Sequence, residues 1–267
     1  GFKSLNEFKE KVKELRKEVR SIYNSVVGES KKVVDVNQVF SKIMFANTAR
    51  AAIDISFLRE GKGLTVSRKF DKTALEAFSK IEDKVYEYLL NAEGPDLCLS
   101  NFVRVIKQAD FPSIWYNEFN DSNFLKIFLE LCERSQLVID LFAEDKVLRE
   151  SFLSRDFLNE ISIDEIKKIR LKNILFRLAV QLTIKLIEPS TASKVLSEAV
   201  REKIKWLSED FSKKKKWKND YLIIVLGSTG TRTMTFASDV DLIFAVKNSS
   251  KYEKIKKIAA GGKILSW

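Results

Sequence analysis

The chain has 267 residues, and 45% of them are hydrophobic, which is enough for a buried core in one large domain or two ordinary ones. It contains no histidine, and this excludes catalytic triads with an imidazole base, zinc sites built on histidine and histidine acid/base catalysis. The formal net charge of +10 favours an acidic partner, although the lysines mostly alternate with glutamates, as they do on solvated helix faces.

Several further classes of protein are disfavoured by the sequence. No stretch is long and apolar enough to cross a bilayer, and the N-terminus is too charged for a signal peptide, so we expect a cytoplasmic protein without membrane contact. Cys98 and Cys132 lie among apolar helical neighbours and are expected to be buried free thiols. The dense lysine run at 213–216 with Lys218 is expected to be a solvated loop rather than a phosphate-binding patch.

Helical periodicity dominates the chain before the last 60 or so residues, where the pattern changes. Apolar residues at steps of three and four predict one long helix over 1–30. Residues 31–212 are expected to form a helical bundle domain. Its first predicted helices cover 33–60, where β-branched residues leave strand as an alternative, 73–90, 96–109, 121–133 and 135–143.

The end of the bundle is predicted from capping residues and prolines. Ser162 and Glu165 form a capping box, which predicts a long helix to about residue 187 that Pro189 ends. Ser190 or Thr191 is expected to cap a last helix that runs to about residue 207.

Two short apolar runs, 221–227 and 239–246, then break the helical pattern. They are rich in β-branched and large apolar residues and predict two buried strands around the turn 227–238. The sequence therefore predicts a mainly α protein with a small α/β part, in which the start of a second domain over 219–267 follows the helical bundle.

Asp239 and Asp241 stand at the start of the second predicted strand. Because side chains alternate along a strand, the two carboxylates should share one face about 6.6 Å apart, with Val240 and Leu242 on the opposite, buried face. Two neighbouring carboxylates repel each other unless a cation lies between them, and Mg²⁺ takes hard oxygen ligands of this kind. The pair is therefore a candidate metal site.

The turn before these aspartates has the composition of a phosphate-binding turn. Gly227 directly after a strand permits close approach of the backbone to a phosphate, Ser228 offers a hydroxyl and an N–H, and Gly230 keeps the turn uncrowded. Arg232 is within reach of a phosphate as well. With a polyphosphate on the turn and a metal on the aspartates, the natural reaction is in-line transfer of a nucleotidyl group.

The segment 226–244, LGSTGTRTMTFASDVDLIF, resembles without a gap the active-site segment of the glutamine synthetase adenylyltransferases, whose pattern is LGKLGGRELNFASDLDLIF. The residues that coincide are Leu226, Gly227, Gly230, Arg232, Phe236, Ala237, Ser238, Asp239, Asp241, Leu242, Ile243 and Phe244. The resemblance implies a nucleotidyltransferase, polymerase-beta-like mixed sheet. It also implies an enzyme that transfers AMP from ATP to a tyrosine of glutamine synthetase or another protein acceptor, or removes it by phosphorolysis.

The resemblance further implies Mg²⁺ or Mn²⁺ on Asp239 and Asp241, which would be the catalytic and metal-binding residues. The residues implied to contact ATP are Gly227, Ser228, Gly230, Thr231, Arg232 and Ser238. In that family two catalytic units lie in tandem, so the helix over 1–30 corresponds to the end of the first unit and this chain to the junction and the start of the second.

The sequence also departs from the family pattern. Ser228 replaces a lysine, Thr231 a glycine and Thr233 a glutamate, and the motif Val-Asp-x-Arg-Leu-Arg-Pro that carries a third carboxylate is absent. We therefore expect a fragment that does not catalyse by itself. Two alternatives stay open: a nucleotidyltransferase that acts on RNA or a small molecule, and a helical interaction module whose catalytic segment has decayed.

Overall fold

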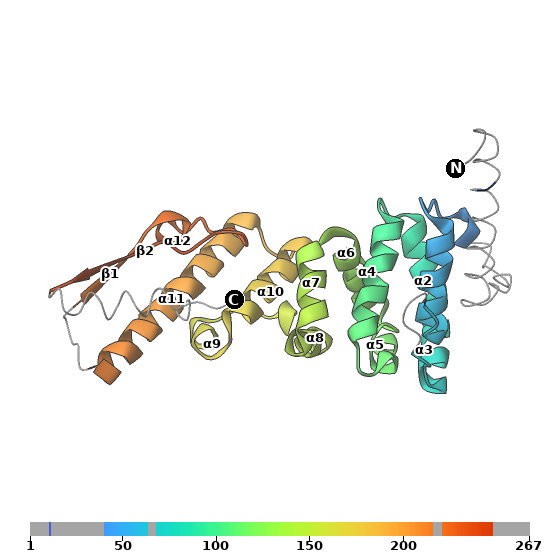
Figure 1. Ribbon diagram of the computed structural model, residues 1–267, viewed down its shortest axis with the longest axis horizontal. Helices are drawn as coiled ribbons and strands as arrows, with labels where there is room; N and C mark the ends of the chain where they lie inside the picture. The colour runs from blue at the N-terminus through green and yellow to red at the C-terminus, as the bar shows by residue number, and fades with distance from the viewer. Residues whose placement is uncertain (1–10, 12–39, 64–67, 216–220, 248–267) are drawn as a thin grey trace.

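The computed structural model describes Lys11 and residues 40–63, 68–215 and 221–247. This part of the chain is mainly helical, and its helices follow one another along the long axis of an elongated body that ends in a two-stranded sheet (Figure 1). The helix predicted over 1–30 lies outside the described residues apart from Lys11, which is helical. None of the described helices is long and apolar enough to span a membrane.

The first part of the body consists of a series of helices, most of which are separated by only a few residues. Its elements are η1 (Phe40–Lys42), α2 (Thr48–Glu60), α3 (Lys72–Leu90), α4 (Pro95–Gln108), α5 (Pro112–Glu118), α6 (Ser122–Arg134), α7 (Gln136–Glu144), α8 (Lys146–Leu153) and η2 (Asp156–Leu158). Helices α3, α4, α6 and α7 begin and end within one residue of the predicted bounds. Helices α5 and α8 were not predicted, and the helix predicted over 33–60 begins only at Thr48 within the described residues.

The second part contains α9 (Ile163–Lys168), α10 (Leu171–Thr183) and α11 (Pro189–Lys215). The prediction that Pro189 ends a helix is wrong. Pro189 begins α11, where its missing N–H costs no helical hydrogen bond. Ser190 and Thr191 therefore lie inside the first turn of α11 rather than at its cap. The helix also runs beyond the predicted end near residue 207.

The single long helix predicted from Ser162 is wrong, because the chain breaks between α9 and α10 at Ile169 and Arg170, which are extended. The capping prediction itself is confirmed, since the Ser162 Oγ accepts a hydrogen bond from the Glu165 N–H at 3.2 Å. The Glu165 carboxylate, however, pairs with Arg177. In one straight helix these residues would be about 18 Å apart along the axis, so the pair requires the break.

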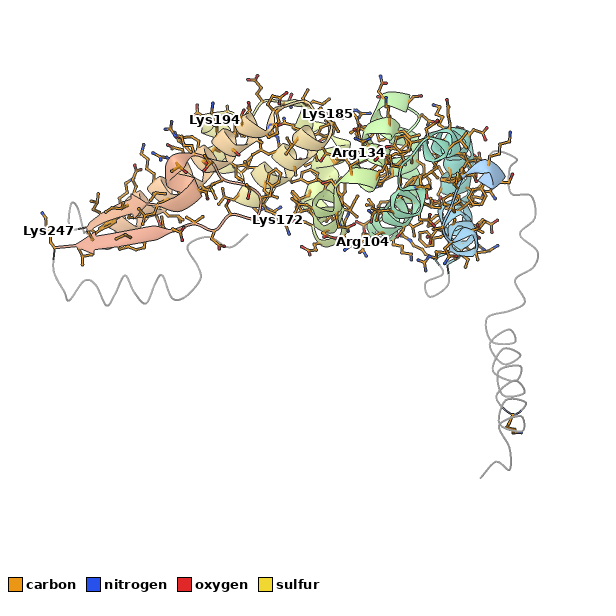
Figure 2. All side chains as sticks on the ribbon, turned by 90° about the horizontal axis from the view of Figure 1, so that it is seen from above. Arg104, Arg134, Lys172, Lys185, Lys194 and Lys247 are labelled. Carbon is orange, nitrogen blue, oxygen red and sulfur yellow. The ribbon has the colours of Figure 1, made fainter. Side chains whose placement is uncertain are left out.

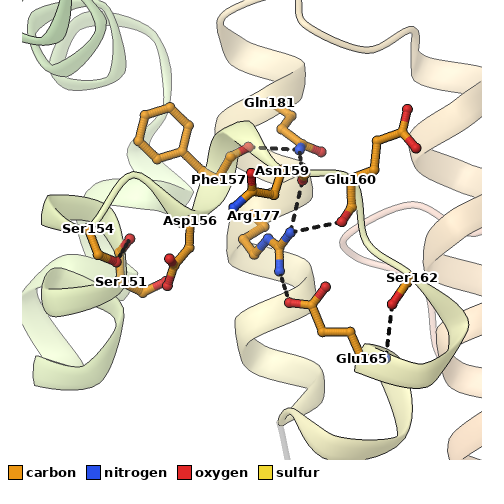
Figure 3. Close-up of polar contacts among 10 residues, drawn as sticks. All are labelled: Ser151, Ser154, Asp156, Phe157, Asn159, Glu160, Ser162, Glu165, Arg177 and Gln181. Atoms are coloured by element: carbon orange, nitrogen blue, oxygen red, sulfur yellow. Dashed lines mark hydrogen bonds and ion pairs between the residues drawn. The ribbon is translucent and has the colours of Figure 1, made fainter.

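Arg177 and Gln181 project from α10 and hold the segment between η2 and α9 (Figure 3). Arg177 is 4% exposed, pairs with Glu165 and donates a 2.9 Å hydrogen bond to the Asn159 carbonyl. Gln181 Nε2 donates to the carbonyls of Phe157 and Asn159 at 2.8 and 3.0 Å. These buried contacts satisfy backbone oxygens that would otherwise lose their water partners without replacement.

Two clusters of buried apolar side chains form the core, and α10 contributes to both. The larger cluster, rich in phenylalanine, lies among α2 to α8 and receives Phe176 and Val180 from α10. The smaller cluster lies between α9 and α11 and receives Ile174 and Leu178 from the same helix. Helix α10 therefore joins the helical body to α11, which carries the sheet.

Cys98 and Cys132 are buried free thiols, as predicted. Burial raises the pKa of both thiols, because the thiolate would lose its hydration.

The sheet consists of β1 (Tyr221–Val225) and β2 (Leu242–Val246), which pair antiparallel with the short helix α12 (Gly227–Thr231) between them. The prediction of two buried strands is wrong for one face. Side chains alternate between half-buried and exposed in both strands, because one face packs on α11 and the smaller cluster while the other faces outward. Within the described residues nothing covers that outward face.

We expect Arg177→Met to lower the free energy of unfolding by about 3 kcal/mol, because it removes one member of a largely buried ion pair and two hydrogen-bond donors. The matched control is Arg104→Met, whose ion pair with Asp140 is nearly half exposed and should contribute less than about 1 kcal/mol. Urea denaturation of both variants measures the difference, and equal losses would contradict the stabilising role of Arg177.

A second prediction concerns Glu133 of α6, which accepts hydrogen bonds from the Tyr88 hydroxyl at 2.7 Å and from the N–H groups of Glu93 and Gly94 at 2.7 and 3.3 Å. Burial acts to raise the pKa of this carboxyl, but the hydrogen bonds outweigh burial and hold its pKa below the ordinary value. Its stabilising contribution is therefore present above the pKa of an unfolded glutamate, about 4.3, and is lost as the pH falls through the folded pKa.

Urea denaturation over a pH series measures this contribution. The difference in the free energy of unfolding between the wild type and Glu133→Gln should be largest near neutral pH and shrink below the unfolded pKa. A difference that stays constant across the series would show that the hydrogen-bonded carboxylate does not contribute in this way.

Candidate functional site

The predicted phosphate turn takes the form of a strand, a sharp turn and one short helix. Gly227 has a φ of +58°, a left-handed conformation that favours glycine, and it begins α12 directly after Leu226. Gly230 lies so close to β1 that a Cβ there would be 2.7 Å from the Val225 carbonyl oxygen. Both glycines are therefore favoured by the backbone path, and the approach of a phosphate to Gly227 stays a prediction.

The two aspartates follow the turn on an extended segment that leads into β2. Asp239 and Asp241 are exposed, whereas Val240 and Leu242 between and after them are half-buried against the smaller cluster. Exposure therefore alternates along 239–242 as predicted from the sequence, whereas the shared face of the two carboxylates stays a prediction. Neither carboxylate has a hydrogen-bond or ion-pair partner among the residues that the structure describes.

Asp241 and Gly227 lie against each other across the ladder. The Leu226 N–H donates to the Asp241 carbonyl at 2.9 Å, which extends the pairing of β1 with β2 by one residue pair. A Cβ on residue 227 would lie 2.5 Å from the Asp241 Oδ2. Only glycine leaves room for the carboxylate in this position, so the turn and one of the two predicted metal ligands share one small region.

The loop after α12 is anchored in the helical body. Met234 is buried in the smaller cluster, and its N–H donates to the Oγ of the fully buried Ser197 on α11 at 3.3 Å. The buried Thr229 hydroxyl of α12 donates to the Met234 sulfur at 3.2 Å, and Phe236 packs against both apolar clusters. The position of the aspartates is thus set by contacts with α11.

Ser238 shapes the approach to the aspartates. Its Oγ accepts a hydrogen bond from the Thr235 N–H at 2.8 Å, and its own N–H donates to the Thr235 carbonyl at 3.1 Å. These bonds close a tight turn immediately before Asp239. The Ser238 hydroxyl therefore has a structural role in the loop. Its contact with a nucleotide stays a prediction.

Thr231 and Arg232 also make contacts that the sequence did not indicate. The Thr231 hydroxyl donates to the Gly227 carbonyl at 3.1 Å and lies 2.8 Å from the Thr233 hydroxyl, which closes the end of α12. Arg232 is exposed, and its Nε lies 3.6 Å from the Oε2 of Glu198 on α11. Ser228 is half-buried at the start of α12.

Glu198 and Ser197 were not among the predicted site residues. They precede the turn by about 30 positions on a helix whose sequence reads as an ordinary amphipathic one. No local pattern relates them to the turn, so only the packing of α11 against it reveals them.

The residues present fit a hard divalent cation such as Mg²⁺ or Mn²⁺. Two exposed carboxylates without competing partners among the described residues lie two positions apart, and the Asp241 carboxylate lies beside the backbone of Gly227. Magnesium commonly takes one or two carboxylates and completes its shell with water and substrate phosphates. Within the described ranges there is no group of three acidic, cysteine or histidine side chains that would enclose a metal, so the aspartates supply part of a coordination shell.

The described lysine and arginine side chains are not concentrated around the turn and the aspartates. Figure 2 shows six labelled cations spread along the body, from Arg104 and Arg134 among the central helices to Lys247 at the end of the sheet. Of the dense lysine run, Lys213 is exposed on α11, and Lys216 and Lys218 lie outside the described residues. Among the described residues, the basic side chains thus do not gather in one continuous surface of the kind that nucleic-acid binding requires.

Comparison of the chain with protein-family models, with curated proteins and with solved structures finds no match.

Proposed function

We propose that β1, α12 and the Asp239–Asp241 segment form the phosphate- and metal-binding half of a nucleotidyl-transfer site. The observation that carries this proposal is the close approach of the Asp241 carboxylate to Gly227, with Asp239 also exposed two residues earlier. A metal–polyphosphate complex needs carboxylate oxygens beside an uncrowded backbone turn. This small region combines the two features.

The proposed reaction is transfer of AMP from ATP to a protein hydroxyl. The acceptor we propose is a tyrosine of glutamine synthetase, as the resemblance of the active-site segment implies. The alternative direction is removal of AMP by phosphorolysis, a separate reaction in which inorganic phosphate attacks the phosphorus of the tyrosyl-AMP, the bond to the tyrosine oxygen breaks and ADP forms. An acceptor oxygen attacks the α-phosphorus, the bond to the bridging oxygen of pyrophosphate breaks, and the acceptor proton passes to solvent. Bound Mg²⁺ or Mn²⁺ would stabilise the charge that develops on the leaving pyrophosphate.

The chain's own residues would position the reacting groups. Asp239 and Asp241 would hold the metal, and the backbone at Gly227 and Ser228 would lie along the phosphates. Arg232 would offer a cation to these phosphates, and its contact with Glu198 holds it beside the turn. The remaining ligands would come from the phosphates, from water and from parts of the protein beyond the described residues.

The helical body supports a protein acceptor over RNA. Its described basic side chains are spread along the molecule and alternate with acidic ones, whereas a nucleic-acid substrate calls for a continuous cationic track. Labelled AMP offered with purified glutamine synthetase or with RNA, in parallel reactions of the full-length protein, distinguishes the two acceptors.

In the full-length protein, Asp239→Asn and Asp241→Asn should each reduce metal-dependent AMP transfer by at least about 100-fold, because an amide is a poor ligand for a hard cation. The free energy of unfolding should change by less than about 0.5 kcal/mol, because both side chains are exposed and unpaired within the described region. Asp164→Asn, at an aspartate that is 87% exposed on α9, is the matched control and should retain activity. Unchanged transfer in either site variant would refute the assigned role.

Gly227→Ala tests the contact between the turn and Asp241. The new Cβ would displace the carboxylate, so Mn²⁺ affinity in the presence of ATP should fall about 10-fold or more, as for other changes that reorient a metal ligand. The positive φ should also cost about 1 kcal/mol of folding free energy. Gly94→Ala is the control, since that residue has a φ of −128° and a Cβ there meets nothing closer than 3.9 Å. Titration calorimetry that finds equal Mn²⁺ affinity in both variants would contradict the proposed geometry.

A further inference from the structure

The outward face of the sheet continues from the aspartates as an apolar surface. Next to the Leu226–Asp241 pair, Ile224 lies opposite Ile243, and the following pair on this face is Leu222 with Ala245. We call Leu222, Ile224, Ile243 and Ala245 the apolar platform. The three large side chains are 59%, 41% and 48% exposed, respectively.

The platform is distinct from the apolar residues that hold the sheet in place. Ile223, Val225 and Leu242 alternate with it and pack against the smaller cluster on the other face. The fold therefore does not need large aliphatic side chains on the outward face. Adjacent exposed aliphatic residues beside a polar site are typical of a binding surface.

The platform offers contact area but no hydrogen-bonding groups. The Leu226 N–H donates to the Asp241 carbonyl, so these two opposite residues form a hydrogen-bonded pair. In an antiparallel ladder every second pair is hydrogen-bonded, and Ile224–Ile243 and Leu222–Ala245 therefore belong to the same class. Their backbone N–H and C=O groups are consequently used within the ladder. A ligand on this face can make only apolar contacts, and it must keep its polar edges in water.

We propose that the apolar platform is the subsite for the nucleoside of the bound nucleotide; this assignment rests on the proposed function. A phosphate held at Asp239 and Asp241 tethers the attached sugar and base close to the sheet, and the first platform pair is only about 7 Å further along the strands. The tether makes the local concentration of the base high, so that modest apolar contacts suffice to hold it. A flat base can lie on the aliphatic side chains with its hydrogen-bonding edge in solvent.

This arrangement also determines base selectivity. A site that hydrogen-bonds a base rejects a different base strongly, whereas an aliphatic surface does not distinguish their edges. ATP and GTP should therefore bind the full chain with affinities that differ by less than about threefold.

The test compares the binding of Mn²⁺–ATP with that of Mn²⁺–tripolyphosphate, which lacks the nucleoside, by titration calorimetry on the full chain. The variants are Ile224→Thr and Ile243→Thr, since threonine keeps the β-branch that suits a strand while making the surface polar. Each variant should weaken ATP binding about fivefold and leave tripolyphosphate binding unchanged. Ile114→Thr, at an isoleucine that is 50% exposed on α5, is the matched control and should change neither affinity.

The two probes separate this assignment from the proposed function. If tripolyphosphate binding depends on Asp241 but the platform variants bind ATP like the wild type, the nucleoside subsite is refuted and the phosphate–metal site stands. A platform variant that affects only the Michaelis constant for the acceptor protein would likewise overturn it. If neither probe binds the wild-type chain, the phosphate–metal site fails and the subsite with it.

Discussion

The close approach of Asp241 to Gly227 is the constraint on which the rest of the site depends. A Cβ at residue 227 would come within 2.5 Å of the Asp241 Oδ2 and require this carboxylate to move, and the positive φ of residue 227 turns the chain sharply from β1 into α12. After α12 and the loop that follows it, β2 pairs with β1 in one defined register. The backbone turn at Gly227 and the position of the Asp241 carboxylate therefore depend on the same local geometry.

This geometry is supported by the helical body rather than by the sheet alone. An isolated two-stranded sheet is at best marginally stable in water, so one of its faces needs a partner. Helix α11 provides it, through the smaller apolar cluster and through Ser197, which binds the loop at Met234. Helix α10 links α11 to the larger cluster, and its buried Arg177 holds α9 in a position that a continuous helix would not allow.

The extent to which the sequence predicted this arrangement depends on the range of the interactions involved. Local signals worked well: the bounds of α3 and α6, the Ser162 cap and the alternation of Asp239 and Asp241 follow from periodicity and capping alone. Errors arose where a distant partner decided the outcome. The break before α10 follows from the Glu165–Arg177 pair, and the contact of Glu198 with Arg232 joins segments with no local relation.

The strands illustrate a different reason for error. A run such as YLIIV reads as buried on both faces, because apolar residues fill every position, and sequence alone cannot show that only one face acquires a cover. The same composition has two physical consequences here, since odd-numbered positions of β1 pack on α11 and even-numbered positions face outward. The nucleoside subsite that we propose for the outward face would account for its apolar composition.

Register is what keeps these two faces apart. Because side chains alternate with a period of two, a slip of one residue in β2 would turn Leu242 outward and direct Asp241 into the apolar cluster. Burying an unpaired carboxylate costs several kcal/mol, so that such a slip is strongly disfavoured. The requirement that the aspartates remain in water thus helps to specify the pairing of the strands, and the same pairing places the carboxylates beside Gly227.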